Sequence, residues 1–274
     1  MKEILVLADT TAASQQRIEI AARYAKRFGA HVTGLFIRPE IQIPQFVEKS
    51  AFLEARRQYD IEFKTRLEVV ETQFRQAMAD LAGGSEWIEE VGDFNDIVIG
   101  YSRRADLVLL GQHNPEQQGD PVLDEPDKVI LRSGRPVMVV PYVQCPLNPP
   151  HCIVVAWDGS REAARALYDA MPLLQAADLV ELCTIAEPKS AAAAYAGLDE
   201  MVVHLERHGV PAVARRLSRS GLSVGNLLLN HIVDSGADML VAGAYGHNRL
   251  REVVLGGVTR DLLEHCSVPL LMSR

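Results

Sequence analysis

The feature that most constrains the fold of this chain is an internal repeat, because three apolar segments recur in the same order in its two halves. In the first half they are 4–11, 105–111 and 135–140, and in the second half they are 153–160, 237–243 and 268–272. One such match could arise by chance, but three in register indicate two copies of one structural unit.

A proline-rich segment separates the copies. Residues 145–150 read Cys-Pro-Leu-Asn-Pro-Pro, which cannot continue a helix or a central strand. A chain of 274 residues also suits two units at roughly 150 residues per domain. We therefore expect domains at 1–143 and 151–274, joined by a short extended linker.

Within each half, apolar runs alternate with amphipathic helical patterns, which predicts a doubly wound parallel α/β sheet with helices on both faces. In the second half we expect strands at 152–157, 179–185, 211–217, 238–243 and 268–272. Helices are expected there at 160–174, 194–208, 223–235 and 258–266.

The first half differs by a long helical pattern over 47–82, which predicts one helix or two helices broken near Asp60. Its apolar residues recur at helical spacing: Phe52, Tyr59, Phe63, Leu67, Val70, Phe74, Met78 and Leu81. The stripe is either a core face with an overhang or a surface for a partner, such as a second copy of the chain.

Composition excludes several classes of function. The net charge of −8 and the pI of about 5.5 argue against a nucleic-acid binder and against anionic membrane surfaces. No apolar run approaches the ~18 residues of a membrane span, and the short apolar stretch near the N-terminus does not resemble a signal peptide. The four cysteines form no C-x-x-C pair, so we expect reduced thiols in a cytoplasmic protein.

One segment of the second half carries a ligand-binding pattern. A strand pattern ends at Gly243, Gly246 follows in a G-x-x-G spacing, and nine residues later Gly256 and Gly257 open a helix. Glycines allow a backbone to approach a ligand closely, and a helix N-terminus offers unpaired N–H groups to an anion. The carboxyl end of a parallel sheet is also where such folds bind ligands.

This motif resembles that of the nucleotide-binding members of the universal stress protein family, which carry G-x-x-G, nine residues, then Gly followed by Ser or Thr. Gly243, Gly246 and Gly256 match, whereas Gly257 stands at the hydroxyl position. The resemblance covers the whole chain as two tandem copies. It implies two tandem five-stranded sheets of order 3-2-1-4-5, adenine nucleotide alpha hydrolase-like, and a role in the stress response.

The resemblance also implies ATP, ADP or AMP in the second half, with or without Mg²⁺. The first-strand Asp158 would lie near the ribose or adenine, and Thr184 and Ile185 would pack on the adenine. Gly257 would keep its N–H but lose one hydroxyl contact to phosphate. The candidate binding residues are Ala156, Asp158, Thr184, Ile185, Gly243, Tyr245, Gly246, His247, Gly256, Gly257, Val258 and Thr259.

The first half has lost this motif. Asn114 stands where Gly246 does, and Asp124, Glu125 and Asp127 surround the matching helix start. Carboxylates there would satisfy the helix dipole and repel a polyphosphate, and Asp9 alone does not restore a site. We expect a structural or regulatory copy that binds no nucleotide.

Two weaker signals have simpler explanations. His204 and His208 stand four apart on an expected helix, the spacing of a shared metal, but without a third ligand a solvated helix face is favoured. Arg215, Arg216 and Arg219 could hold phosphates or pair with acids of the other half, although plain surface charge is the simpler interpretation.

Three functions remain open at this point. The first is a regulatory module that binds adenine nucleotide, with an unidentified protein partner and assembly as a homodimer or an intrachain pseudo-dimer. The second is a slow ATPase or nucleotidyl transferase, and the third is a scaffold with a vestigial site. We favour the first, because the glycine spacing is intact while no P-loop, nucleophile elbow, metal site or catalytic carboxylate pair is evident.

Overall fold

The computed structural model describes residues 1–38, 49–116, 126–186, 191–218, 221–245 and 257–274. The first half contains β1 (Glu3–Ala8), α1 (Ala12–Phe28), β2 (His31–Arg38), α2 (Lys49–Met78), β3 (Ser85–Val91), α3 (Phe94–Ser102), β4 (Leu107–Gly111), α4 (Pro126–Arg132) and β5 (Val137–Val140). The second half contains β6 (Cys152–Ala156), α5 (Arg161–Asp169), α6 (Met171–Leu174), β7 (Leu179–Ala186), α7 (Ala191–Arg207), β8 (Ala212–Ser218), α8 (Val224–Ser235), β9 (Met239–Gly243), α9 (Gly257–His265) and β10 (Leu270–Ser273).

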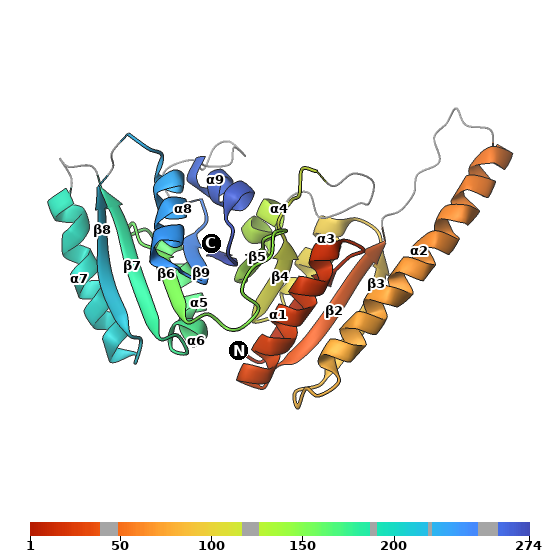
Figure 1. Ribbon diagram of the computed structural model, residues 1–274, viewed down its shortest axis with the longest axis horizontal. Helices are drawn as coiled ribbons and strands as arrows, with labels where there is room; N and C mark the ends of the chain where they lie inside the picture. The colour runs from red at the N-terminus through yellow and green to blue at the C-terminus, as the bar shows by residue number, and fades with distance from the viewer. Residues whose placement is uncertain (39–48, 117–125, 187–190, 219–220, 246–256) are drawn as a thin grey trace.

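The strands form one continuous sheet of order β3-β2-β1-β4-β5-β10-β9-β6-β7-β8 (Figure 1). Each half has the predicted order 3-2-1-4-5, with parallel pairing inside it. The two sheets merge because β5 pairs antiparallel with β10, with Val139 opposite Leu270. This pairing removes two short apolar edges that would otherwise need cover.

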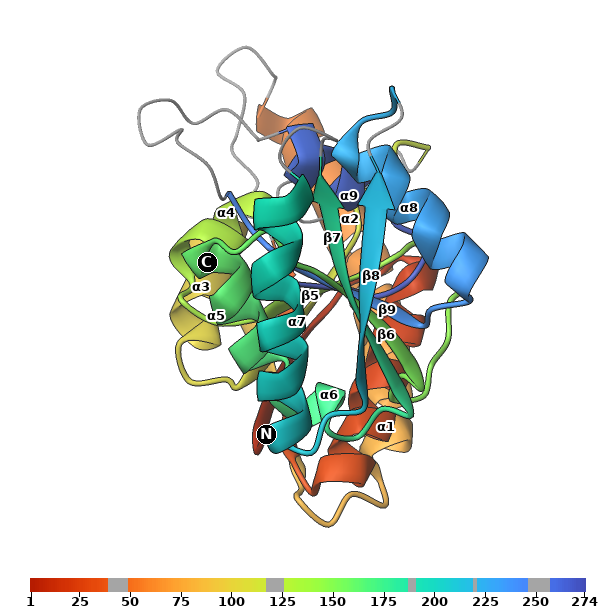
Figure 2. The same cartoon turned by 90° about the vertical axis from the view of Figure 1, so that its left-hand side faces the viewer.

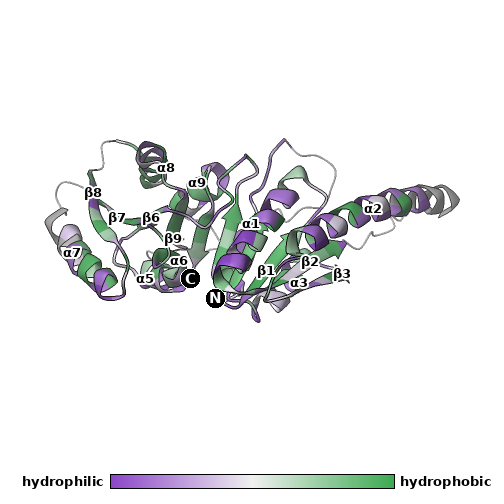
Figure 3. Cartoon of the chain, turned by 60° about the horizontal axis from the view of Figure 1, so that its bottom comes forward, coloured by the Kyte–Doolittle hydropathy of each residue, from purple (hydrophilic) through white to green (hydrophobic). Residues whose placement is uncertain are grey.

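Helices cover both faces of this sheet. The core on one face joins residues of α1, α2, α5, α6 and α7, and the core on the other joins residues of α3, α4, α8 and α9. Figure 2 shows α7 and α8 on opposite sides of β7 and β8. The apolar strands lie between helices whose outer faces are hydrophilic (Figure 3). This double cover explains why the strands read as continuous apolar runs.

Local signals set several helix ends. Asp93 and Ser223 are N-caps, accepting hydrogen bonds from the backbone N–H of Asp96 and Asn226. Gly29 and Gly236 end α1 and α8 in the left-handed region, at φ of 61° and 63°. These caps satisfy backbone groups that the helix ends would leave unpaired.

The long helical pattern forms the single helix α2, unbroken at Asp60 and about 45 Å long at 1.5 Å per residue. Phe63, Val70, Phe74 and Met78 of the predicted stripe are buried. The structure does not describe the side chains of Phe52 and Tyr59. The described part of the stripe is therefore a core face, and a partner surface on this helix stays a prediction.

Two compositional expectations can be compared with the structure. The four cysteines are free thiols, of which Cys145, Cys183 and Cys266 are buried. Within the described ranges, no helix has the length and apolar composition to cross a membrane.

Candidate functional site

The carboxyl ends of β6 and β9 form the switch point of the second half, because β7 and β8 continue the sheet on one side and β10 on the other. Parallel sheets bind ligands in this position. Pairing of β6 with β7 and β9 brings Ala156, Thr184 and Gly243 to this edge. Asp158 follows β6 directly.

Asp158 lies exposed at the turn between β6 and α5. Its carboxylate accepts a hydrogen bond from the Ser160 N–H at 2.9 Å. Ser160 in turn caps α5, because its hydroxyl accepts from the Ala163 N–H at 3.1 Å. The turn thus presents the Asp158 carboxylate to solvent at the switch point.

Thr184 and Ile185 stand near the end of β7, as predicted. Thr184 is buried, and its hydroxyl donates to the Trp157 carbonyl at 2.8 Å. The Trp157 N–H donates to the Cys183 carbonyl at 2.8 Å, which extends the pairing of β6 with β7. The Thr184 side chain therefore holds the segment leading to Asp158, whereas half-buried Ile185 keeps an accessible apolar surface.

Gly243 has a different role from the one expected. A Cβ at this position would lie 2.5 Å from the backbone nitrogen of Ala163 and 2.6 Å from the carbonyl carbon of Glu162. The close approach that requires glycine is therefore that of helix α5, not that of a ligand. Sequence spacing alone does not reveal which backbone comes near.

Tyr245 has an unusual backbone and an unpaired hydroxyl. Its φ of 64° is the one positive value at a non-glycine position among the described residues. Its hydroxyl is buried and has no hydrogen-bond partner among the residues that the structure describes. Burial raises the pKa of this phenol, Asp127 raises it further, and Arg274 opposes the shift. Strained backbone and unsatisfied polar groups cluster at functional positions, which agrees with a site at this edge.

Helix α9 begins at Gly257, as the motif predicts. A Cβ at Gly257 would meet no atom within 4 Å, and Val258 is exposed. Thr259 is buried, so its side chain faces the core. Gly246, His247 and Gly256 lie outside the described residues. The Cβ position of Gly257 is therefore open, whereas the Thr259 side chain is not available to a ligand.

The switch point of the first half, at the carboxyl ends of β1 and β4, is filled by an arginine. Arg17 is 1% exposed, its guanidinium pairs with Asp9, and its Nε donates to the Leu7 carbonyl at 3.1 Å. A Cβ at Gly111 would lie 2.5 Å from an Arg17 nitrogen, so the guanidinium reaches the ends of both β1 and β4. Sequence reasoning did not identify Arg17, although its helical spacing from the buried residues Ser14 and Ala21 places it on the inner face of α1.

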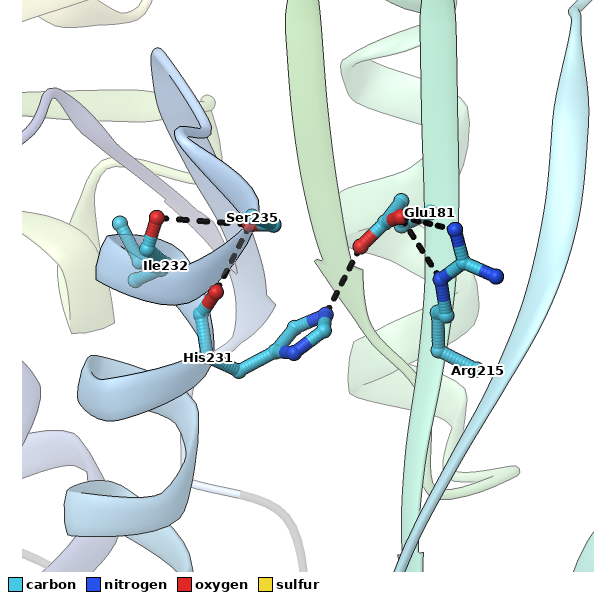
Figure 4. Close-up of polar contacts among 5 residues, drawn as sticks. All are labelled: Glu181, Arg215, His231, Ile232 and Ser235. Atoms are coloured by element: carbon cyan, nitrogen blue, oxygen red, sulfur yellow. Dashed lines mark hydrogen bonds and ion pairs between the residues drawn. The ribbon is translucent and has the colours of Figure 1, made fainter.

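The arginines of β8 pair within their own half. Arg215 binds the buried Glu181 carboxylate at 2.5 Å, and His231 of α8 contacts the other oxygen of that carboxylate at 2.8 Å (Figure 4). Arg216 pairs with Asp199 of α7. Arg219 lies outside the described residues. Arg215 and Arg216 therefore pair with acids of their own half and not with acids of the first half.

The rings of the two helical histidines, His204 and His208, lie close together and are tilted by 40°. Their ring centroids are 4.3 Å apart, and the Tyr168 hydroxyl lies 3.3 Å from the His204 Nε2. In the described ranges, no three His, Cys, Asp or Glu side chains gather closely enough to hold a metal ion.

Residues 151–274 match the model of the universal stress protein family. A universal stress protein of Synechocystis sp. is 25% identical over 187 residues, which cover 67% of this chain and 59% of that protein. The second half of the chain is therefore similar to the universal stress protein family.

Solved structures share the fold of this chain over its whole length. A universal stress protein from Archaeoglobus fulgidus superposes with a TM-score of 0.76 at 17% identity, covering 99% of this chain and 98% of the other. A protein of unknown function from Pseudomonas aeruginosa superposes with a TM-score of 0.61 at 13% identity, covering 100% and 92%. Both matches extend across the two halves, so the paired arrangement also occurs in other chains.

Proposed function

We propose that this protein is a regulatory module of the stress response that binds one adenine nucleotide per chain, at the switch point of its second half. The observation that carries the proposal is the difference between the two switch points. In the first half Arg17 fills the space and neutralises Asp9. In the second half Asp158 is exposed, and the residue at the position of Arg17 is an alanine.

The positional equivalence follows from the chain itself. Arg17 is the sixth residue of α1, and Ala166 is the sixth residue of α5. Both stand eight residues after the aspartate that follows the first strand of their half. The exchange of a long cation for a methyl group removes the guanidinium that occupies this position in the first half.

The start of α9 supports the same placement for the phosphates. Unpaired N–H groups and the helix dipole attract anions there, and Gly257 leaves room for close approach. Exposed Val258 would add a further N–H. The phosphates would lie over this turn and the preceding Gly246 and Gly256, while Ile185 and Ala156 would contact the adenine.

A titration of the full chain with ATP, ADP and AMP, with and without Mg²⁺, tests the proposal, with GTP as the control for base selectivity. We expect one site per chain. Two equivalent sites, or no binding of any adenine nucleotide, would contradict it. Mass spectrometry of ligand extracted from the purified protein would identify the natural nucleotide.

A variant that copies the first-half arrangement into the second half localises the site. Ala166→Arg should direct a guanidinium toward Asp158, as Arg17 does toward Asp9, and abolish binding, although it also adds bulk at a buried position of α5. Ala166→Leu is the control for added bulk without charge. The far-ultraviolet circular dichroism of both variants must match the wild type, and unchanged affinity in folded Ala166→Arg would exclude this placement.

Two further elements belong to the same proposal. We place the protein in the cytoplasm, consistent with four free thiols. Because the antiparallel pair of β5 and β10 already joins the two halves, we expect any homodimer to form through residues 47–82 instead.

A further inference from the structure

The two outer edge strands of the ten-stranded sheet carry side chains of opposite charge, and the arginines of β8 also pair with carboxylates of the neighbouring β7 and α7. The sheet ends at β3 on one side and at β8 on the other. Strand β3 reads Ser-Glu-Trp-Ile-Glu-Glu-Val, with acids at Glu86, Glu89 and Glu90. Strand β8 reads Ala-Val-Ala-Arg-Arg-Leu-Ser, with cations at Arg215 and Arg216.

Each edge strand has one row of backbone groups directed away from the sheet. Gly84 and Gly92 exchange hydrogen bonds with β2, so in β3 the alternate residues, including Trp87 and Glu89, direct their N–H and C=O groups outward. In β8 the Pro211 carbonyl bonds to β7, so Ala214 and Arg216 direct theirs outward. Across the described part of the chain, neither row pairs with another strand.

The charges alternate between the two faces in the same way on both edges. On the face covered by α2 and α7, Trp87 of β3 packs on Phe74 and its indole N–H donates to Glu89. On the same face, Arg216 of β8 forms an ion pair with Asp199 of α7. On the face covered by α3 and α8, the Tyr101 hydroxyl of α3 donates to Glu90. On that same face, Arg215 binds Glu181 and keeps one terminal nitrogen directed away from it (Figure 4).

The direction of the strands also matches. All pairs within a half are parallel and β5 is antiparallel to β10, so β3 runs antiparallel to β8. A second copy in the same orientation would therefore bring its β8 antiparallel to β3 of the first, with both helix layers continuing across the contact. Acid would then face arginine on both faces of the sheet.

Two copies do not pair through the same edge strand, because the two strands would carry the same charge. Two β3 strands would oppose glutamates, and two β8 strands would oppose arginines, and like charges on paired strands are destabilising. Charged edges are a common protection against edge-to-edge association. Here the charges oppose the pairing of β3 with β3 and of β8 with β8, whereas they favour the pairing of β3 with β8.

We propose that β3 of one copy pairs with β8 of a second copy, so that the ten-stranded sheet continues from molecule to molecule. Such a head-to-tail contact is heterologous and builds open chains or rings rather than closed dimers. Because neighbouring strands rotate by roughly 20°, an open chain of this kind is a twisted filament. The proposal is independent of nucleotide binding.

Sedimentation velocity of the full chain, over a range of concentrations, gives the first test. At about 0.01 M salt, where the Debye length is roughly 30 Å, we expect the mean mass to rise with protein concentration to at least twice that of one chain. At about 1 M salt, where the Debye length is roughly 3 Å, the association should disappear. A single chain at every concentration in low salt would overturn the proposal.

A charge exchange identifies the surfaces. Glu86→Lys/Glu89→Lys has two basic edges, and Arg216→Glu/Ser218→Glu has two acidic edges, so neither variant should associate alone. Their equimolar mixture should regain the wild-type association, because each variant then meets an opposite edge. Arg215 is left in place because it holds Glu181.

Ala214→Pro provides a charge-neutral variant. It removes one outward N–H from β8, which an edge strand tolerates, and should abolish the association. Association that persists in this variant and in both charge variants alone would place the contact on another surface and refute the proposal. If Ala214→Pro does not fold, the mixing experiment alone decides.

Discussion

The Arg17 guanidinium and the Asp9 carboxylate form an ion pair inside the first half, where their side chains are 2% and 9% exposed. Asp9 is held further by the Thr11 N–H, which donates to its carboxylate at 2.8 Å. A charged pair this deeply buried makes the removal of one partner costly, because the other charge then lacks both water and a counter-ion.

Arg17→Met should lower the free energy of unfolding by about 3–5 kcal/mol, because it leaves Asp9 buried and unpaired. Arg17→Met/Asp9→Asn should recover a large part of this loss. Urea denaturation followed by circular dichroism measures both. Arg260→Met is the control, since its ion pair with Glu264 is on the surface, with side chains 63% and 47% exposed. A loss at Arg17 no larger than that at Arg260 would disprove the structural importance of the buried pair.

Alkaline pH should destabilise the protein through its buried thiols. Burial raises the pKa of Cys183 from 9.0 to about 12, with Glu181 adding to the shift. The folded state keeps the proton where the unfolded chain loses it, so this contribution is complete below pH 9 and is lost as pH rises toward 12. The free energy of unfolding from urea denaturation should fall less steeply between these limits in Cys183→Ala, by up to about 1.4 kcal/mol per pH unit. Equal slopes in the two proteins would contradict the assignment.

Tyr245→Phe should stabilise the protein without ligand by about 1 kcal/mol, because it removes a buried hydroxyl that has no partner. Thermal unfolding measures this change. If the hydroxyl contacts nucleotide, the same variant should bind ATP more weakly, so stability and affinity should move in opposite directions. A destabilised variant would show that the hydroxyl has a partner in solution.

Gly257→Ser should tighten ATP more than ADP by about 1 kcal/mol, the value of one hydrogen bond. The position has room for the side chain, and serine restores the hydroxyl of the family pattern. Gly197→Ser is a matched control, since a Cβ there also meets no atom within 4 Å. Calorimetric affinities for both nucleotides give the comparison, and an equal change for ATP and ADP would place the hydroxyl away from the terminal phosphate.

The sequence predicts the strands and helices well because helices cover both faces of the sheet, so its strands are continuous apolar runs, such as residues 153–156. It also predicts the start of α9 at Gly257 from a glycine pair. It does not reveal the Glu181, Arg215 and His231 cluster, because those residues come from three elements and meet only through strand register and helix packing. The contact of Gly243 with helix α5 could not be predicted from the sequence for the same reason.

The pairing of β5 with β10 has a consequence for how the two halves can change. Two separate chains that met through this contact would dissociate on dilution, whereas halves on one polypeptide remain joined at any concentration. A substitution in one half is also not copied into the other, as it would be in a symmetric homodimer. The first half could therefore acquire a buried arginine at its switch point while its partner kept an alanine, and the shared sheet remained intact.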